Sequence, residues 1–414
     1  MDIYCRHPLR CRTDFGALRR FTLELMPPRI RDPELLGLLG DILGQGRAPA
    51  ATGVMRLRLM NQGFSWQSLV DLASEQDVLP PLILALSERG LLLPVPRSTK
   101  SGGESHVTAR FEVIYRQHLE RRKREKRQLE KILSVLDDAG IVTLILKGAR
   151  YLVAPVGSWC EARAMRDIDL LVRSGDGERA LSALVVAGYQ SGPHVALKHH
   201  HLPELWRPGE PIALEIHTEA HSFDAERVMS TEHVWEYAVK LGTGTFLVMP
   251  NRWHALHCML HHQISDHGYR RRILAVKALW EWTMLARDFS REDWDAIVGH
   301  MEAAGALDML ASWLMQAHRL FGVEIPALVV VSPDARANAD ATFRLASTPH
   351  WMRRTRFIAD QLRFSFARET LAMRYGIPRS RVSLMDAGRY VAHLFRQHRG
   401  RVLLRLTGHR DRPS

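Results

Sequence analysis

The stretch "LILKGARYLVAPVGSWCEARAMRDIDLLV", residues 144–172, decides the fold of this chain. It begins with a short apolar run, passes a Lys-Gly pair, and ends in a second apolar run that carries Asp167 and Asp169. Both runs have the length and composition of strands. On a strand, residues i and i+2 lie on one face, so the two aspartates point together while Ile168 and Leu170 point the other way. The stretch therefore predicts two strands, the second with two carboxylates on one side.

A third carboxylate is found in "PIALEIHTEA", residues 211–220, where Leu214 and Ile216 form an apolar face and Glu215 and His217 lie on the opposite face. Two buried aspartates side by side repel each other and lose their hydration, and a divalent cation is the natural compensation. Chemistry on such a cation usually needs a third acid. Glu215 is therefore predicted to be the third metal ligand or, alternatively, the base that deprotonates an incoming hydroxyl.

The first strand ends at Lys147 and Gly148 and is predicted to turn into a short helix. A glycine at this point allows close approach of the backbone, and the amide groups of the turn can face a phosphate. Lys147 adds a compact positive charge. Two cations held by the carboxylates can activate an attacking hydroxyl and stabilise the pyrophosphate that leaves a nucleoside triphosphate.

The rest of the chain is read as helical on both sides of an α+β core. A loop or linker is expected at residues 94–106, followed by a long helix that stops at Gly140. Helical patterns return from about residue 251. We therefore expect a mixed β-sheet core flanked by N-terminal and C-terminal helical regions, divided into a helical N-terminal region (1–108), the α+β core with its long leading helix (109–250), and a helical C-terminal region with a basic tail (251–414).

The composition points to a chain in a reducing compartment with an anionic partner. The formal net charge is +12 and the four cysteines show no Cys-x-x-Cys spacing or disulfide-scaffold density. The first twenty residues lack the apolar core of a signal peptide, and no apolar run is long enough for a transmembrane segment. A cytoplasmic location is expected.

The motifs together resemble a known family. The segments "LKGA", "RAMRDIDLLV" and "LEIH" are similar to those of the uncharacterised nucleotidyltransferase family, within the DNA polymerase beta-like superfamily. Helical segments on both sides, such as "FSWQSLVDLASEQDVLPPLILAL" and "LHHQISDHGYRRRIL", also resemble the family. The resemblance spans roughly residues 60–330.

This resemblance implies a nucleotidyltransferase-type fold and a set of site residues. The implied metal ligands and catalytic acids are Asp167, Asp169 and Glu215, and the implied nucleotide and phosphate contacts are Lys147, Gly148 and Arg163. The implied cofactor is Mg²⁺, as two ions, with Mn²⁺ as the alternative. This chain departs from the superfamily pattern in two ways near the expected phosphate contact. Ala149 follows Gly148 where the superfamily usually has serine, and the spacing from Gly148 to Asp167 is longer than in most members.

The predicted function is transfer of a nucleoside monophosphate from a nucleoside triphosphate to an unknown hydroxyl or phosphate acceptor, with release of pyrophosphate. The acceptor is a small molecule, a protein or a nucleic acid. The alternative is a catalytically degenerate binding module that keeps the fold and holds nucleic acid or a protein partner through its basic helices. Ala149 in place of serine favours this alternative.

Each residue also has a plainer interpretation. Asp167 and Asp169 would then be solvated acids at a strand end, Lys147 and Arg163 surface bases or partners of those acids, and Glu215 an edge-strand residue. His217 is read as a packing or hydrogen-bonding histidine. The triplet at 199–201 is read as a polar loop, the charged run 121–127 as a solvated helix face, and the role of His254, His257 and His261 stays open.

Overall fold

The computed structural model of the chain describes residues 32–44, 49–61, 63–92, 103–191, 201–242 and 245–349, and part of the stretch 352–392. The chain divides into two compact units, Pro28–Thr348 and the combination of Met1–Pro27 with Pro349–Ser414. Cys5, Cys11, His199, His200 and the basic tail beyond residue 392 lie outside the described residues. The larger unit contains all the candidate site residues.

Seven strands of the described residues form one mixed sheet in the order β3-β4-β5-β2-β1-β7-β6. Their bounds are β1 Thr143–Ile145, β2 Asp167–Val172, β3 Gln190–Ser191, β4 Leu205–Trp206, β5 Ala213–His217, β6 Val239–Lys240 and β7 Phe246–Val248. Strand β2 pairs antiparallel with β1 and parallel with β5. The predicted α+β fold with a mixed sheet is therefore confirmed, and the two strands of the opening stretch are direct neighbours.

The side chains of β2 alternate between two cores, as a period of two requires. Ile168, Leu170 and Val172 are fully buried in a core shared with Leu129 of helix α6 (Gly103–Asp138) and Leu184 of helix α9 (Gly177–Val186). Leu171 points the other way, into the core formed with the C-terminal helices. Asp167 and Asp169 lie on this second face, because they alternate with the apolar residues as the sequence predicts.

The N-terminal helices of this unit are α2 Pro33–Leu43, α3 Pro49–Leu59, α4 Trp66–Glu75, α5 Leu79–Glu88 and α6 Gly103–Asp138. Ser65 caps α4 by accepting a hydrogen bond from the Ser68 backbone N–H, as its type favours. Pro80 and Pro81 lie in the first turn of α5, where no intrahelical donor is lost, and this explains why the apolar pattern breaks there. Of the predicted linker 94–106, residues 103–106 belong to α6 and the rest lie outside the described residues.

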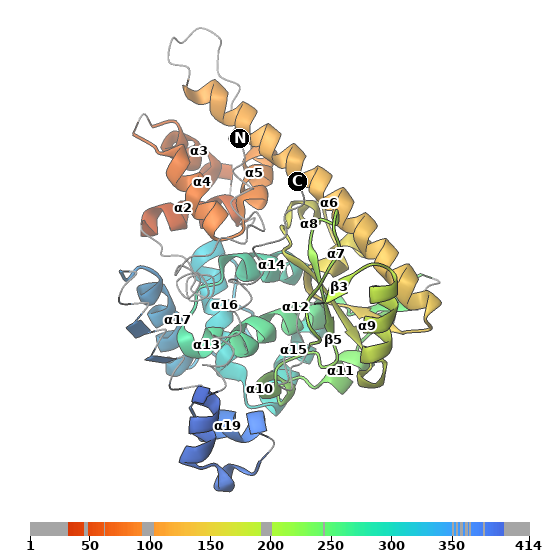
Figure 1. Ribbon diagram of the computed structural model, residues 1–414. Helices are drawn as coiled ribbons and strands as arrows, with labels where there is room; N and C mark the ends of the chain where they lie inside the picture. Colours follow the sequence, from red (N-terminus) through yellow and green to blue (C-terminus); the bar gives the residue numbers. More distant parts are fainter. Residues whose placement is uncertain are drawn as a thin grey trace. The chain divides into compact units, whose positions relative to one another are not determined.

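Helix α6 is the long helix along one side of the unit in Figure 1, and it contacts both the N-terminal helix α5 and helix α9 beside the sheet. The short elements of the α+β core are η1 Lys147–Ala149, α7 Arg150–Val153, α8 Trp159–Ala162, η2 Ser174–Asp176, α9 Gly177–Val186, α10 Phe223–Glu226 and α11 Thr231–Glu236. The predicted helical turn after the first strand is thus η1 followed by α7. Both lie at the end of β1, next to β2.

The helices after the sheet are α12 Asn251–Leu260, the π-helix η3 His261–Ser265, α13 Gly268–Arg271, α14 Val276–Ala286, α15 Arg291–Ala303, α16 Leu307–Phe321 and α17 Pro333–Ala346. Ser290 and Asp293 form a capping box at the start of α15, as their residue types and spacing favour. Helices α12 and α14 pack against each other and contribute Leu256 and Leu279 to the core that also contains Leu171. These helices therefore cover the face of the sheet that carries the acids.

The second unit has a small core of its own. Its described elements include α19 Arg368–Tyr375, η4 Arg379–Arg381 and a helical stretch at 384–392. Leu371, Val382 and Tyr390 are buried together. Among the described helices of the chain, none combines the length and apolar character needed to cross a bilayer.

Candidate active site

The register of β2 and β5 sets two of the three predicted acids side by side. Asp169 is the direct partner of Glu215 across the parallel pair, and Asp167 is the partner of Ala213. Asp169 is buried, whereas Asp167 and Glu215 are partly exposed. The structure therefore sets Asp169 beside Glu215, and Asp167 lies two residues away on the same face of β2.

His217 joins these acids, although sequence reasoning left it outside the site. Its Nε2 lies 3.0 Å from Oδ1 of Asp169 and 3.5 Å from Oε2 of Glu215. The interpretation of His217 as a hydrogen-bonding histidine is correct, but its partners are the candidate catalytic acids. The signal was present in the sequence, because strand alternation places His217 and Glu215 on the same face.

Lys147 supplies the positive charge of the site. Its Nζ donates a hydrogen bond to Oδ1 of Asp169 at 2.7 Å, and its side chain is largely buried. The backbone of Lys147 has a φ of 43°, a left-handed conformation that is uncommon for residues other than glycine. This conformation at the end of β1 accompanies the turn into η1 beside Asp169.

The two aspartates of β2 titrate in opposite directions. Burial, together with the negative charges of Asp169 and Glu215, raises the pKa of Asp167. Burial would also raise the pKa of Asp169, but Lys147 and the hydrogen bond from His217 hold it well below its usual range. Burial alone would lower the pKa of Lys147, but the carboxylates around it raise its pKa. Asp169 and Lys147 therefore form an ion pair, and Asp167 holds its proton more strongly than an exposed aspartate does.

Glu215 and His217 also stabilise each other's charge. The hydrogen bond from His217 lowers the pKa of Glu215, against the effect of its partial burial. Burial favours the neutral form of His217, but its hydrogen bonds to Asp169 and Glu215 raise its pKa. The cluster therefore holds negative charge where a cation or a protonated imidazole can balance it.

Gly148 and Arg163 are in direct contact. A Cβ atom added to Gly148 would lie 1.7 Å from Nη1 of Arg163, so no larger residue fits without a shift. Nε of Arg163 also forms an ion pair with Oε1 of Glu281 on α14 at 2.8 Å. The glycine of the "LKGA" motif thus admits the guanidinium of Arg163 to the turn after β1.

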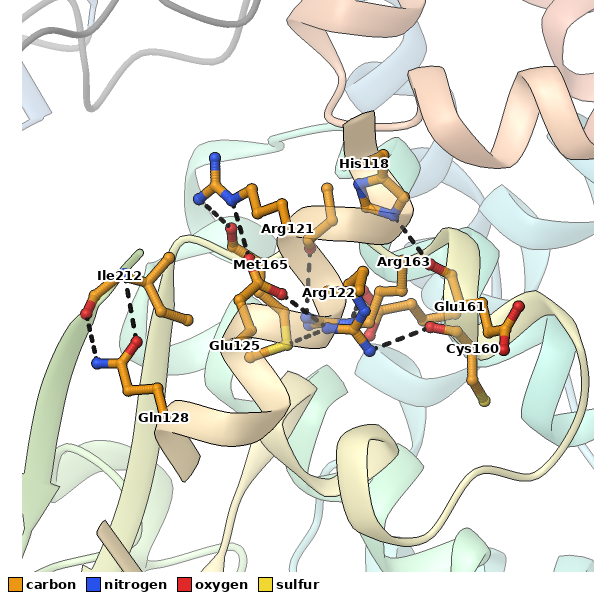
Figure 2. Close-up of polar contacts among 12 residues, drawn as sticks. His118, Arg121, Arg122, Glu125, Gln128, Cys160, Glu161, Arg163, Met165 and Ile212 are labelled. Carbon is orange, nitrogen blue, oxygen red and sulfur yellow. Dashed lines mark hydrogen bonds and ion pairs between the residues drawn. The ribbon is translucent and has the colours of Figure 1, made fainter. Parts of the chain in front are cut away.

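The starts of the two acid-bearing strands are held by the inner side of α6, as Figure 2 shows. His118 Nε2 donates to the Glu161 carbonyl at 2.8 Å, and Arg122 Nη2 donates to the Cys160 carbonyl at 3.2 Å, both in the segment that leads to β2. Gln128 exchanges two hydrogen bonds with the backbone of Ile212, the residue before β5. Helix α6 therefore anchors the segments that set where Asp167 and Glu215 lie.

The prediction that the charged run 121–127 is a solvated helix face is wrong for two of its residues. Arg122 and Glu125 are buried, with 7% and 1% of their surfaces exposed, and they form an ion pair of 3.2 Å. Their burial is tolerated because each finds a charged or carbonyl partner. Lys123, Arg124, Lys126 and Arg127 of the same run are exposed, as predicted.

The histidines of α12 and η3 line the covered side of the site. His254 and His257 are fully buried, and His257 Nδ1 lies 3.1 Å from Nε2 of His221. Burial, together with the charge of Lys147, lowers the pKa of His261 to about 4, so this side chain is neutral near pH 7. Its position in a π-helix is notable, because such turns are frequent at functional sites.

The side chains of this site fit a divalent cation. Ligand atoms of Asp169, Glu215 and His217 all lie within 4.8 Å of one another, and they form the single group of three or more candidate metal ligands among the described residues. Two carboxylates suit Mg²⁺ and Mn²⁺, and an imidazole suits Mn²⁺ and heavier ions. Asp167 begins the same face of β2 but is not part of this group. The group therefore differs from the predicted ligand set in two ways: it contains His217, and it lacks Asp167.

The mixed sheet flanked by helices is consistent with a nucleotidyltransferase-type fold, and comparison with protein families supports this class. Residues 62–322 match the family described as "Uncharacterised nucleotidyltransferase". The chain belongs to this family, which confirms the resemblance predicted for residues 60–330. Comparisons with curated proteins and with solved structures gave no match.

Proposed function

We propose that the chain is a metal-dependent nucleotidyltransferase that moves a nucleoside monophosphate from a nucleoside triphosphate to a hydroxyl or phosphate acceptor. The family supports nucleotidyl transfer in general. The observation that carries the proposal is the parallel register that sets Asp169 beside Glu215, on the face of β2 that also bears Asp167. The acceptor is a small molecule, a protein or a nucleic acid.

In the proposed reaction the acceptor oxygen loses its proton and bonds to the α-phosphorus. The bond from the α-phosphorus to the bridging oxygen of pyrophosphate breaks, and its electron pair leaves with pyrophosphate. Two magnesium ions, or manganese ions, held by Asp167, Asp169 and Glu215 would supply positive charge to the reacting oxygens. Glu215 keeps a lowered pKa, so it is ionised near neutral pH and can hold a cation.

The basic residues of the turn after β1 are proposed to bind the triphosphate. Lys147 is paired with Asp169 in this structure, and a cation at the acids would compete with its ammonium group. Lys147 would then be available to bind a phosphate oxygen. This step needs only a change in the conformation of its side chain. Gly148 and Arg163 lie in contact at the same turn, where a guanidinium can bind phosphate through two parallel hydrogen bonds.

The binding-module alternative also has a structural observation in its favour. The Lys147 to Asp169 ion pair neutralises the most deeply buried acid of the site without any metal ion. A protein that had lost turnover could keep this arrangement.

The free thiols of Cys160 and Cys258 support a reducing compartment for either function, and we propose the cytosol.

Thermal unfolding in the presence of ATP, CTP, GTP or UTP, each with Mg²⁺ or Mn²⁺, tests the proposal directly. An assay of pyrophosphate release, with a cell extract as the source of the acceptor, is the second test. A ligand that binds the native state raises its melting temperature. We expect one or more nucleotides to do so only with a divalent cation. Absence of any shift, or an equal shift in the Asp167→Asn and Asp169→Asn double variant, would refute it. Salt-sensitive binding of RNA or DNA without pyrophosphate release would favour the alternative.

A further inference from the structure

One oxygen of Asp169, Oδ1, is in contact with two nitrogen-bearing side chains of the site. The ammonium group of Lys147 donates a hydrogen bond to it at 2.7 Å, and Nε2 of His217 lies 3.0 Å from it. The same Nε2 lies 3.5 Å from Oε2 of Glu215, which is the direct partner of Asp169 across the parallel strands. The imidazole of His217 therefore lies beside both acids, at the end of β5.

The spacing of these atoms fits the ligands of one small cation. Ligand atoms about 2.1 Å from an octahedral ion lie about 3.0 Å apart when they are adjacent and about 4.2 Å apart when they are opposite. The separations of 3.0 Å and 3.5 Å from Nε2 of His217 to the two acids are close to the value for adjacent ligands. One ligand atom from each of the three residues lies within 4.8 Å of the other two. Three ligand atoms are thus already near the positions that one ion requires.

The group is closed at one end and open at the other. The side chains of Asp169 and His217 are only 2% and 1% exposed, whereas that of Glu215 is 24% exposed. A cation would therefore enter past Glu215. At the closed end the ion gives up water ligands, and the lone pair of an imidazole nitrogen can replace one of them.

We propose that Nε2 of His217 is a ligand of the cation held by Asp169 and Glu215, and that this nitrogen makes the site bind Mn²⁺ more tightly than Mg²⁺. This inference rests on the proposed function, and it adds one ligand and a metal preference. Carboxylate oxygens suit both ions, whereas imidazole nitrogen suits transition metals, and Mg²⁺ prefers oxygen ligands and keeps several of its waters. When the cation displaces the ammonium of Lys147, neutral His217 carries its proton on Nδ1 and directs the lone pair of Nε2 to the ion. Asp167 is left to the second ion, which has oxygen ligands only.

Electron spin-echo spectroscopy of Mn²⁺ bound to the full-length chain tests directly for a nitrogen ligand. The nuclear spin of a coordinated nitrogen modulates the echo, and we expect this modulation in the wild type and its loss in His217→Gln. His233→Gln, which removes an exposed histidine of α11, is the matched control and should retain the modulation. Absence of nitrogen modulation in the wild type with Mn²⁺ bound would overturn the inference, and this result does not depend on the folding of any variant. Modulation that persists in His217→Gln would overturn the role of His217.

Isothermal titration with Mn²⁺ and with Mg²⁺, without nucleotide, tests the metal preference. We expect the wild type to bind Mn²⁺ about tenfold or more tightly than Mg²⁺, and His217→Gln to reduce this ratio to about threefold or less. Loss of a histidine that only supports the acids through hydrogen bonds would weaken both ions together and leave the ratio unchanged. Equal affinities in the wild type, or an unchanged ratio in His217→Gln, would overturn this inference alone, because nucleotide-dependent stabilisation still tests the proposed function. A wild type that binds neither ion, with or without ATP, would overturn both.

Discussion

The two faces of strand β2 differ in what they contribute to the molecule. On one face Ile168, Leu170 and Val172 pack into an apolar core with α6 and α9. On the other face Asp167 and Asp169 lie among Lys147, Glu215 and His217. The apolar face stabilises the fold by removing hydrocarbon from water. The charged face instead gathers several ionisable groups at one position, and burial of each of these groups costs free energy.

This difference shows how a single strand can be both a core element and a reactive one. The apolar face fixes the position of the backbone, so the acids on the opposite face need little freedom of their own. A change on the apolar face should therefore reduce stability more than activity, and a change on the charged face should do the reverse. Four variants test this expectation, ordered from the largest expected effect to the smallest.

The charged face is tested by the Asp167→Asn and Asp169→Asn double variant. Loss of both carboxylates removes the proposed cation ligands, and we expect pyrophosphate release to fall about 100-fold or more, beyond what loss of a supporting partner usually costs. A steady-state assay of pyrophosphate release measures this. Glu178→Gln, which removes an exposed acid of α9, is the control. Activity of the double variant within a factor of two of wild type would contradict the assignment.

The apolar face is tested by Leu170→Ala. This residue is fully buried, so its truncation should lower the free energy of unfolding by about 2–5 kcal/mol. Urea denaturation measures the loss, and activity per folded molecule should stay close to wild type. Val186→Ala on the exposed side of α9 should change stability by no more than about 0.5 kcal/mol. An activity loss larger than the stability loss would show that the two faces are not separable.

The contact between Gly148 and Arg163 is tested by Gly148→Ala. The added methyl group would overlap the guanidinium, so either Arg163 leaves Glu281 or the turn moves, at a cost of about 1–3 kcal/mol. Gly175→Ala is the matched control, because nothing lies within 4 Å of its added Cβ. Thermal unfolding of Gly148→Ala alone and combined with Arg163→Met gives the coupling between the sites. Additive effects would exclude the contact.

The buried histidines on the charged side predict sensitivity to acid. Burial, with the charges of Arg150 and Arg163, lowers the pKa of His254 well below 6.5. The unfolded chain therefore binds the extra proton first, and the stability that neutral His254 contributes is complete above pH 6.5 and lost as the pH falls. His254→Gln should reduce the slope of stability against pH below 6.5 by up to about 1.4 kcal/mol per pH unit. Urea denaturation at pH 7.5, 6.0 and 5.0 measures this, and an unchanged slope would contradict it.

Local patterns in the sequence predict much of the fold. The alternation in "DIDLLV" and "ALEIH" places the acids opposite the apolar residues, and the helical period of "GERALSALVVAGY", residues 177–189, predicts a helix where the structure has α9. Ser65 and the pair Ser290 and Asp293 predict helix starts that the structure contains. These features depend on neighbours in sequence, so the chain alone specifies them.

Features that depend on partners distant in sequence are less accessible. Arg122 and Glu125 look like part of a solvated run until the carbonyl of Cys160 is placed beside them. His217 becomes a site residue only through the register of β5 with β2, which brings it to Asp169. Tertiary packing decides these contacts, although strand alternation by itself places His217 on the same face as Glu215.

The parallel pairing of β2 with β5 also has an evolutionary consequence. Backbone hydrogen bonds between the strands hold Asp169 beside Glu215, and the described part of the chain between them contains α9, β3 and β4. Exposed loop positions of this connection can vary while the two acids keep their spacing, whereas Leu184 and Leu205 are fixed in the core. Descendants of one ancestral chain can in this way change what they recognise beside the site without rebuilding the site itself.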